Sequence, residues 1–117
     1  MIAVVCKSAC LGQELAAMAQ DETVEAFASE DSPDADWEGW LAGTLTNGRV
    51  RAVFYEPRFF VDPAPFRAAS PDTRFVVLCA PGDEGLARDA IARGARAMLE
   101  KPVDPKEFRS VLSLVSG

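Results

Sequence analysis

The sequence predicts a doubly wound α/β domain, in which helices cover both faces of a parallel sheet. Short unbroken apolar runs recur along the chain, and such runs are typical of strands that are buried on both faces. Each run is followed by a segment whose apolar residues have helical spacing, and five such alternations fit right-handed crossovers. The 117 residues suffice for one core, so we expect a single domain over residues 1–117.

Five segments are expected to form the strands. They are Ile2–Cys6, Val24–Ala28, Arg51–Glu56, Phe75–Cys79 and Ala97–Leu99. The third strand should end at or near Glu56, because Pro57 cannot donate to a ladder. Glu56 is therefore expected at the carboxyl edge of the sheet, where ligands and chemistry gather in open α/β folds. The alternative is that Glu56 is only the first polar residue of a loop.

The first two helices are marked by apolar spacing and by capping residues. Ser8 is a plausible N-cap for the first helix, whose apolar face is Leu11, Leu15 and Met18. The second helix carries an apolar stripe and should end at Asn47-Gly48. Its stripe consists of Trp37, Trp40, Leu41 and Leu45. We expect the tryptophans to be core residues, with at least one indole buried, and not a binding platform.

The other three helices have start signals of their own. Asp62-Pro63 predicts a short helix with Phe66 facing inward. The next helix should start at Gly82 or Asp83 and stop at Gly94. Its apolar residues are Leu86, Ala90 and Ile91. Asp104-Pro105 predicts a last helix with an apolar inner face, formed by Phe108, Val111, Leu112 and Val115.

Composition excludes several classes of function. The net charge is −6 with no basic stripe, which argues against direct nucleic-acid binding. The absence of histidine removes the Ser-His-Asp and Cys-His arrangements. Cys6, Cys10 and Cys79 lack zinc spacing and are expected to be buried free thiols. No apolar run reaches the roughly 20 residues of a membrane span, and no signal peptide is evident, so we expect a cytoplasmic protein without membrane contact.

The most specific motif is GARAMLEKPVDPKEF, residues Gly94–Phe108. It resembles the end of the receiver (CheY-like) domains of bacterial response regulators, where a GA-x-x-aromatic-L-x-KP-x-x-P-x-E-hydrophobic pattern spans strand five and helix five. Leu78–Glu84 resembles the L-T/S-A-x-G-D-E sequence that follows strand four in that family. Together with the strand spacing, the resemblance covers essentially the whole chain. It implies a flavodoxin-like sheet of order 2-1-3-4-5 and a role in two-component signal transduction.

The resemblance fails where receivers carry out phosphoryl transfer. Working receivers use an aspartate after strand three as acceptor, two acids after strand one for Mg²⁺, a Thr or Ser after strand four, an aromatic switch residue in strand five and a lysine after it. Only the lysine is kept, as Lys101. The corresponding positions here are Glu56 for the acceptor, Cys6 and Lys7 for the acids, Cys79 for the hydroxyl and Met98 for the aromatic. A soft thiol and a cation are poor partners for Mg²⁺, so we expect no metal at this degenerate pocket.

The sequence therefore predicts a pseudo-receiver, a non-enzymatic module that signals through protein contacts without phosphorylation. Two alternatives stay open: a degenerate receiver that is still phosphorylated in a phosphorelay, and a small enzyme that uses Glu56, Lys7 and Lys101. No glycine-rich loop follows the first strand, so neither a nucleotide nor a flavin is expected, and we expect no cofactor. Without a metal, Glu56 needs compensating charge, and we expect a lysine ammonium, from Lys7 or from Lys101, to supply it.

A partner surface follows from the resemblance. In the family, helix four, strand five and helix five form the usual contact face, through which a homodimer could also assemble. Here that face carries Arg88, Arg93, Arg96, Glu100, Lys106 and Arg109. The alternative is a solvated charged face with no partner.

Overall fold

Strands and helices alternate along the whole chain. A computed structural model describes residues 1–19, 22–32, 34–47 and 49–116. The elements are β1 (Ile2–Cys6), α1 (Ala9–Ala19), β2 (Val24–Ala28), α2 (Trp37–Asn47), β3 (Ala52–Tyr55), α3 (Ala64–Ala69), β4 (Arg74–Cys79), α4 (Glu84–Ala92), β5 (Ala97–Glu100) and α5 (Pro105–Ser116). All five expected strands and all five expected helices are present, with boundaries that differ from the sequence expectation by one or two residues.

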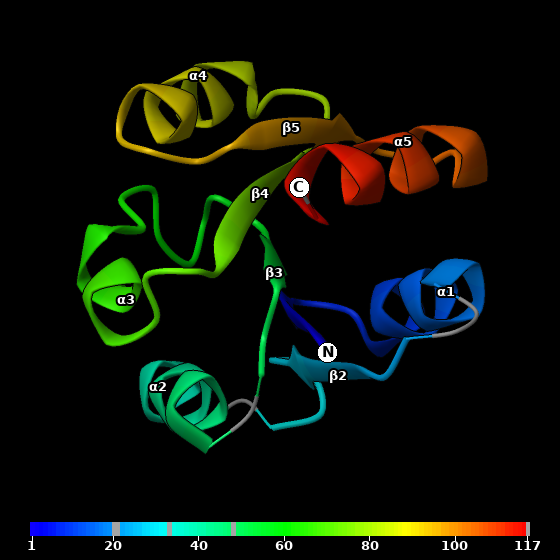
Figure 1. The fold of residues 1–117 in the computed structure, drawn as a ribbon. Coiled ribbons are helices and arrows are strands. Elements are labelled where there is room, and N and C mark those ends of the chain that lie inside the picture. Colours follow the sequence, from blue (N-terminus) through cyan, green and yellow to red (C-terminus); the bar gives the residue numbers. More distant parts are fainter. Residues whose placement is uncertain (20–21, 33, 48, 117) are drawn as a thin grey trace.

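The five strands form one parallel sheet of order β2-β1-β3-β4-β5. This confirms the flavodoxin-like order 2-1-3-4-5. Helices α1 and α5 cover one face of the sheet, whereas α2, α3 and α4 cover the other (Figure 1). The parallel register brings the carboxyl ends of β1, β3, β4 and β5 to the same edge, and Glu56 follows directly after β3.

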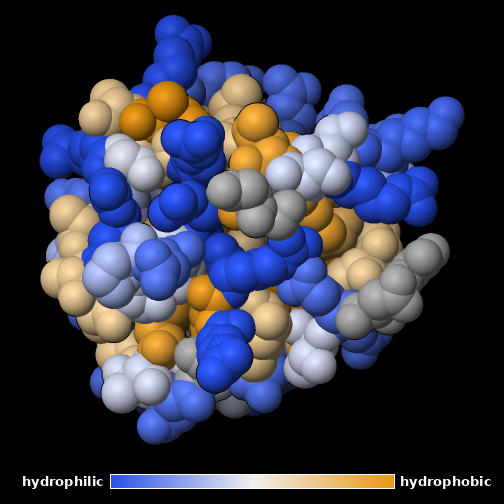
Figure 2. Space-filling view, viewed as in Figure 1, coloured by the Kyte–Doolittle hydropathy of each residue, from blue (hydrophilic) through white to orange (hydrophobic). Residues whose placement is uncertain are grey.

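Two apolar cores lie on the two faces of the sheet. Alternate residues of a strand point to opposite faces, so Val4 and Phe54 join the core under α1 and α5, while Val5 and Tyr55 join the core under α2 and α4. Strand β3 is buried along its whole length. This double burial explains why the strands appear in the sequence as unbroken apolar runs. Figure 2 shows polar side chains over much of the surface, with apolar atoms exposed between them.

The expected helix starts are confirmed by hydrogen bonds from backbone N–H groups to capping side chains. The Ser8 hydroxyl accepts from the N–H of Cys10 at 3.3 Å. The Asp62 carboxylate accepts from Ala64 at 2.9 Å, and Asp104 accepts from Lys106 at 2.7 Å. These bonds satisfy N–H groups that have no partner within the helix.

The stop of α4 is also as expected. Gly94 has a φ of 122°, a conformation that favours glycine, and it follows the last residues of the helix. The expected stop of the second helix at Gly48 lies outside the described residues, although α2 does extend to Asn47.

The expectation of a buried indole in α2 was wrong. Leu41 and Leu45 are the buried residues of this helix, and both tryptophans are only partly buried at its margin. Trp37 stacks on Phe60 with ring centroids 5.4 Å apart, and Trp40 packs on Phe27 at 5.8 Å. The two leucines face the sheet, and the larger indoles pack against the core as partly buried side chains.

Two other burial expectations need correction. In α4 the buried residues are Ala87 and Ala90, while Leu86 and Ile91 are 38% and 42% exposed. Small side chains on the inner face let this helix approach the sheet closely. Cys6 and Cys79 are buried free thiols as expected, but Cys10 is exposed because it lies on the outer side of the first turn of α1.

No helix within the described part of the chain is long and apolar enough to cross a membrane.

Candidate functional site

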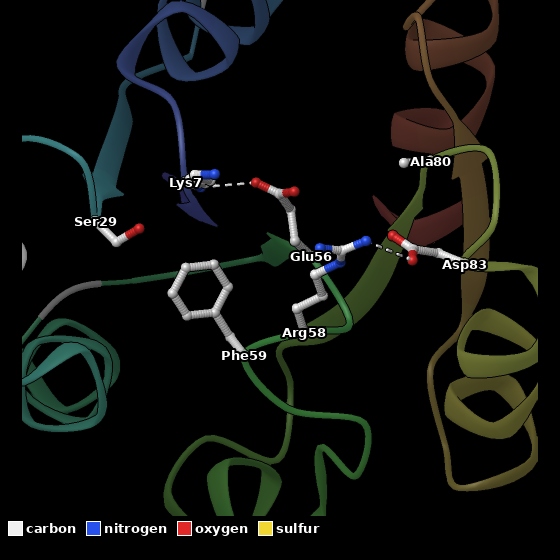
Figure 3. Close-up of a pocket in the computed structure, with 7 residues that line it drawn as sticks. All are labelled: Lys7, Ser29, Glu56, Arg58, Phe59, Ala80 and Asp83. Carbon is white, nitrogen blue, oxygen red and sulfur yellow. Dashed lines mark hydrogen bonds and ion pairs between the residues drawn. The ribbon is translucent and has the colours of Figure 1, made fainter.

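A pocket of about 240 Å³ opens at the carboxyl edge of the sheet, next to the end of β3 (Figure 3). Loops after β1, β2, β3 and β4 contribute to its walls. The lining residues are Lys7, Ser29, Glu56, Arg58, Phe59, Ala80 and Asp83. The sequence expectation placed Glu56 at this edge, and the structure agrees.

Both carboxylate oxygens of Glu56 are occupied by donors from this chain. Oε1 accepts a hydrogen bond from the backbone N–H of Lys7 at 2.7 Å. Oε2 accepts from the Lys101 ammonium, also at 2.7 Å. The side chains of Glu56 and Lys101 are only 14% and 22% exposed, so solvent screens this ion pair less than it would a surface pair. Hydrogen bonds to charged groups are the stronger class.

Backbone contacts hold the two partners of this ion pair in place. The N–H of Glu56 donates to the carbonyl of Val5 at 3.1 Å, which continues the pairing of β3 with β1. The N–H of Lys101 donates to the carbonyl of Cys79 at 2.9 Å, which continues the pairing of β5 with β4. The ion pair therefore ties the loop after β3 to the loop after β5, across the end of β4.

The ammonium of Lys7 does not supply the compensating charge. Among the described residues, the Lys101 ammonium is the only side-chain cation within 4.0 Å of the Glu56 carboxylate. Lys7 contributes its backbone N–H instead, and its side chain is exposed. Lys7 follows β1 directly, so its N–H reaches the neighbouring end of β3 while its side chain extends into water. The Lys7 version of the expected ion pair was therefore wrong, and the Lys101 version is confirmed.

The two buried cysteines near this edge are held as neutral thiols. The Cys6 thiol donates to the carbonyl of Ser8 at 3.2 Å and lies 3.6 Å from the carbonyl of Phe27. Burial, followed by the negative charge of Glu56, raises the pKa of Cys6 to about 11. Burial is also the main cause that raises the pKa of the Cys79 thiol. Both thiols are therefore protonated at neutral pH.

The pocket holds a second ion pair, which was not expected from the sequence. The Arg58 guanidinium lies 3.4 Å from the carboxylate of Asp83, whose side chain is 7% exposed. Arg58 lies in the loop after β3, and Asp83 lies in the turn before α4. Their positions in the sequence could have indicated this pair, because both residues follow strands that end at the same edge of the sheet.

The remaining expected site residues lie away from this pocket. Met98 lies in β5 and is 41% exposed. The residues of the expected partner face are all exposed, namely Arg88, Arg93, Arg96, Glu100, Lys106 and Arg109. Within the described residues, no three His, Cys, Asp or Glu side chains come together as a metal site.

Neither a protein-family model nor a curated protein matches this sequence. Solved structures do match its fold. The receiver domain of NtrX from Brucella abortus is 19% identical with a TM-score of 0.75, over 98% of this chain and 97% of that chain. The chemotaxis response regulator CheY4 of Vibrio cholerae is 21% identical with a TM-score of 0.71, over 97% of this chain and 96% of that one.

A longer protein contains the same fold as one part. Full-length FixJ from B. japonicum is 18% identical with a TM-score of 0.75, over 98% of this chain. The match spans only 56% of the FixJ chain. The sheet order, the five alternating helices and these structural matches lead to one conclusion: this chain has the fold of a response-regulator receiver domain.

Proposed function

We propose that this chain is a receiver-like signalling domain that acts through protein contacts and does not use phosphorylation. One observation carries the proposal: both oxygens of Glu56, at the acceptor position, are engaged by the Lys7 N–H and the Lys101 ammonium. Each of these short charge-assisted bonds lowers the nucleophilicity of the carboxylate oxygen that accepts it.

The charges around the pocket also disfavour a metal-assisted reaction. Phosphoryl transfer needs cationic neutralisation of the phosphate oxygens, commonly from Mg²⁺ held by carboxylates. Here Glu56 pairs with Lys101, and Asp83 pairs with Arg58. Each of the two carboxylates is thus already paired with a cation of this chain, and the neutral Cys6 thiol adds no negative charge.

The same ion pair supports a fixed conformation. A receiver switches when its acceptor pocket rearranges, whereas here Glu56 and Lys101 already join the loops after β3 and β5. A ligand can shift a conformational equilibrium only by its difference in affinity for the two states. A domain whose acceptor-position carboxylate is already bound by its own Lys101 would present one surface permanently.

We propose that the contact surface lies over α4, β5 and α5. A groove of about 480 Å³ lies between β5 and α5, and Met98 is exposed at its margin. Glu100 and Lys106 add opposite charges to the same groove. An exposed apolar side chain bordered by charged groups is a common composition for a protein contact. The partner is a protein of the signalling pathway or a second copy of this chain.

The first test is phosphorylation with acetyl phosphate and Mg²⁺, followed by intact-mass spectrometry. We expect no added phosphoryl group on the wild-type protein. Glu56→Gln is the control that cannot accept a phosphoryl group at this position. The triple variant Cys6→Asp, Lys7→Asp, Glu56→Asp restores the acceptor and the acidic pair, and tests whether the fold itself is competent. A phosphoryl adduct on the wild type that disappears in Glu56→Gln contradicts the proposal.

The second test addresses the homodimer. If the partner is a second copy, sedimentation velocity over a wide range of protein concentration shows a dimer that Met98→Glu weakens. Leu114→Glu is the matched control, because Leu114 is 57% exposed and lies outside the groove. A monomer at every concentration excludes the second copy as the partner at this surface.

A further inference from the structure

A second pocket, of about 120 Å³, lies at the amino edge of the sheet, opposite to the edge that carries Glu56. It is formed by the end of α3, the start of β4 and the turn between α4 and β5. Figure 1 shows α3 beside this turn. The lining residues are Arg67, Thr73, Arg74, Phe75, Gly94 and Arg96. Half of them are arginines, in a protein whose net charge is −6.

The fold fixes the backbone positions of the three arginines. Arg67 lies in the last turn of α3. The N–H of Arg74 donates to the carbonyl of Arg51 at 2.9 Å, and the N–H of Arg96 donates to the carbonyl of Phe75 at 2.7 Å. Both backbone contacts belong to the first rungs of the sheet, so Arg74 and Arg96 start from neighbouring strands.

Gly94 lets the Arg67 side chain reach the same place. A Cβ atom at Gly94 would collide with the Arg67 guanidinium, so the guanidinium lies directly against the backbone of the α4–β5 turn. Gly94 has a positive φ, which favours glycine, and its lack of a side chain leaves the space that Arg67 occupies. Arg67 is thereby brought from α3 to the turn that precedes Arg96.

The three guanidinium groups have no carboxylate partner among the described residues. None of them lies within 4.0 Å of an Asp or Glu oxygen there, whereas Arg51 pairs with Glu22 and Arg58 pairs with Asp83. Thr73 does not provide a free donor either, because its hydroxyl donates to the carbonyl of Val50 at 2.6 Å. The pocket is therefore lined by three arginines that have no carboxylate partner among the described residues, and the Arg67 guanidinium lies against its Gly94 wall.

We propose that this pocket binds a phosphate-class oxyanion, either free or at the end of a small phosphate ester. Guanidinium groups are planar forks that bind phosphate oxygens in pairs. A dianion matches a pocket lined by three arginines better than a monovalent carboxylate does. The pocket volume is several times the roughly 30 Å³ of one water molecule, so a tetrahedral anion fits.

The site is separate from the acceptor-like pocket. The two pockets share no residue and lie at opposite edges of the sheet. Anion binding here therefore does not depend on whether Glu56 can be phosphorylated, and its failure would leave the proposed function untouched.

The test is an NMR titration that follows the arginine Nε–Hε signals at constant ionic strength. Inorganic phosphate and sulfate should shift the signals of Arg67, Arg74 and Arg96 saturably, and acetate should bind at least about tenfold more weakly. Arg67→Gln should weaken phosphate binding about tenfold, and Arg67→Lys should weaken it less, since it keeps the charge but loses the fork. Arg109→Gln is the matched control, because Arg109 is exposed on α5 and carries the same charge.

Glycerol 3-phosphate separates the two sources of the anion. Binding at least as tight as that of inorganic phosphate identifies an esterified ligand, and much weaker binding identifies the free anion; either result supports the site. Shifts that do not saturate, that appear equally at Arg88 and Arg109, or that survive Arg67→Gln unchanged would overturn the proposal. Thermal unfolding of each variant verifies that it is folded.

Discussion

The ion pair between Glu56 and Lys101 should stabilise this domain measurably. The charged atoms lie 2.7 Å apart, and both side chains are mostly shielded from water. Coulomb's law at this distance gives about 1.5 kcal/mol in bulk water and about 6 kcal/mol at an effective dielectric constant of about 20. Desolvation of both charges opposes this attraction. We therefore expect a net coupling energy of about 1–3 kcal/mol.

A double-mutant cycle measures this coupling. Glu56→Gln and Lys101→Met are made singly and together, and the free energy of unfolding is determined by urea denaturation at pH 7. Glutamine keeps an oxygen that can still accept the Lys7 N–H, so the cycle isolates the charge pair from that backbone bond. Each single variant leaves one charge partly buried without its partner. Its loss in free energy of unfolding should therefore exceed half of the loss in the double variant.

A second cycle is the matched control. Lys7→Met combined with Glu56→Gln should show coupling below about 0.5 kcal/mol, because the Lys7 ammonium is exposed and makes no ion pair with Glu56. Coupling near zero in the Lys101 cycle, or coupling of equal size in the Lys7 cycle, would refute the reasoning. The free energy of unfolding must depend on urea concentration with the same slope in all variants, so that their stabilities can be compared.

Three further predictions concern single groups. In the native protein a thiol reagent at pH 8 should modify only the exposed Cys10, and three free thiols should appear after denaturation without reductant; one thiol would indicate a disulfide. Tyr55→Phe should leave stability unchanged or raise it by up to about 1 kcal/mol in thermal unfolding, because the buried Tyr55 hydroxyl has no hydrogen-bond partner among the described residues; a clear loss would reveal one. Burial raises the pKa of Cys6 from 9.0 to about 11 and also raises that of Tyr55, so the folded state holds these protons more tightly. The stability that these two groups contribute should therefore be lost as the pH rises from about 9 toward 11. Cys6→Ser should flatten this alkaline loss, and an unchanged pH profile in that variant would contradict the assignment to Cys6.

The strands and helix ends could be predicted from local sequence because local physics determines them. A strand buried on both faces must be apolar throughout, and Ala52–Tyr55 shows this directly. Capping residues such as Ser8, Asp62 and Asp104 act on N–H groups only two or three residues away. The position of Glu56 at the sheet edge follows from the same reasoning, since it is the first polar residue after a buried strand.

Burial within helices was predicted less well, because it depends on how closely each helix approaches the sheet. The spacing of Leu86 and Ile91 indicated an apolar face, yet the sheet accepts the smaller Ala87 and Ala90 there. Trp37 and Trp40 share the stripe of Leu41 and Leu45, but only the leucines face the sheet directly. Apolar spacing marks a face of the helix and does not fix which side chain reaches the core.

The amino-acid sequence by itself determined the alternation of strands and helices, the carboxylate at the end of β3 and the loss of the receiver-type acids. Only the tertiary structure decided which lysine pairs with that carboxylate, because Lys7 and Lys101 lie 49 and 45 residues from Glu56 and either could have reached it. It also brought together Arg67, Arg74 and Arg96, which come from three different segments. Side-chain direction at the end of a strand depends on the pairing of its neighbours, and that pairing exists only in the folded sheet.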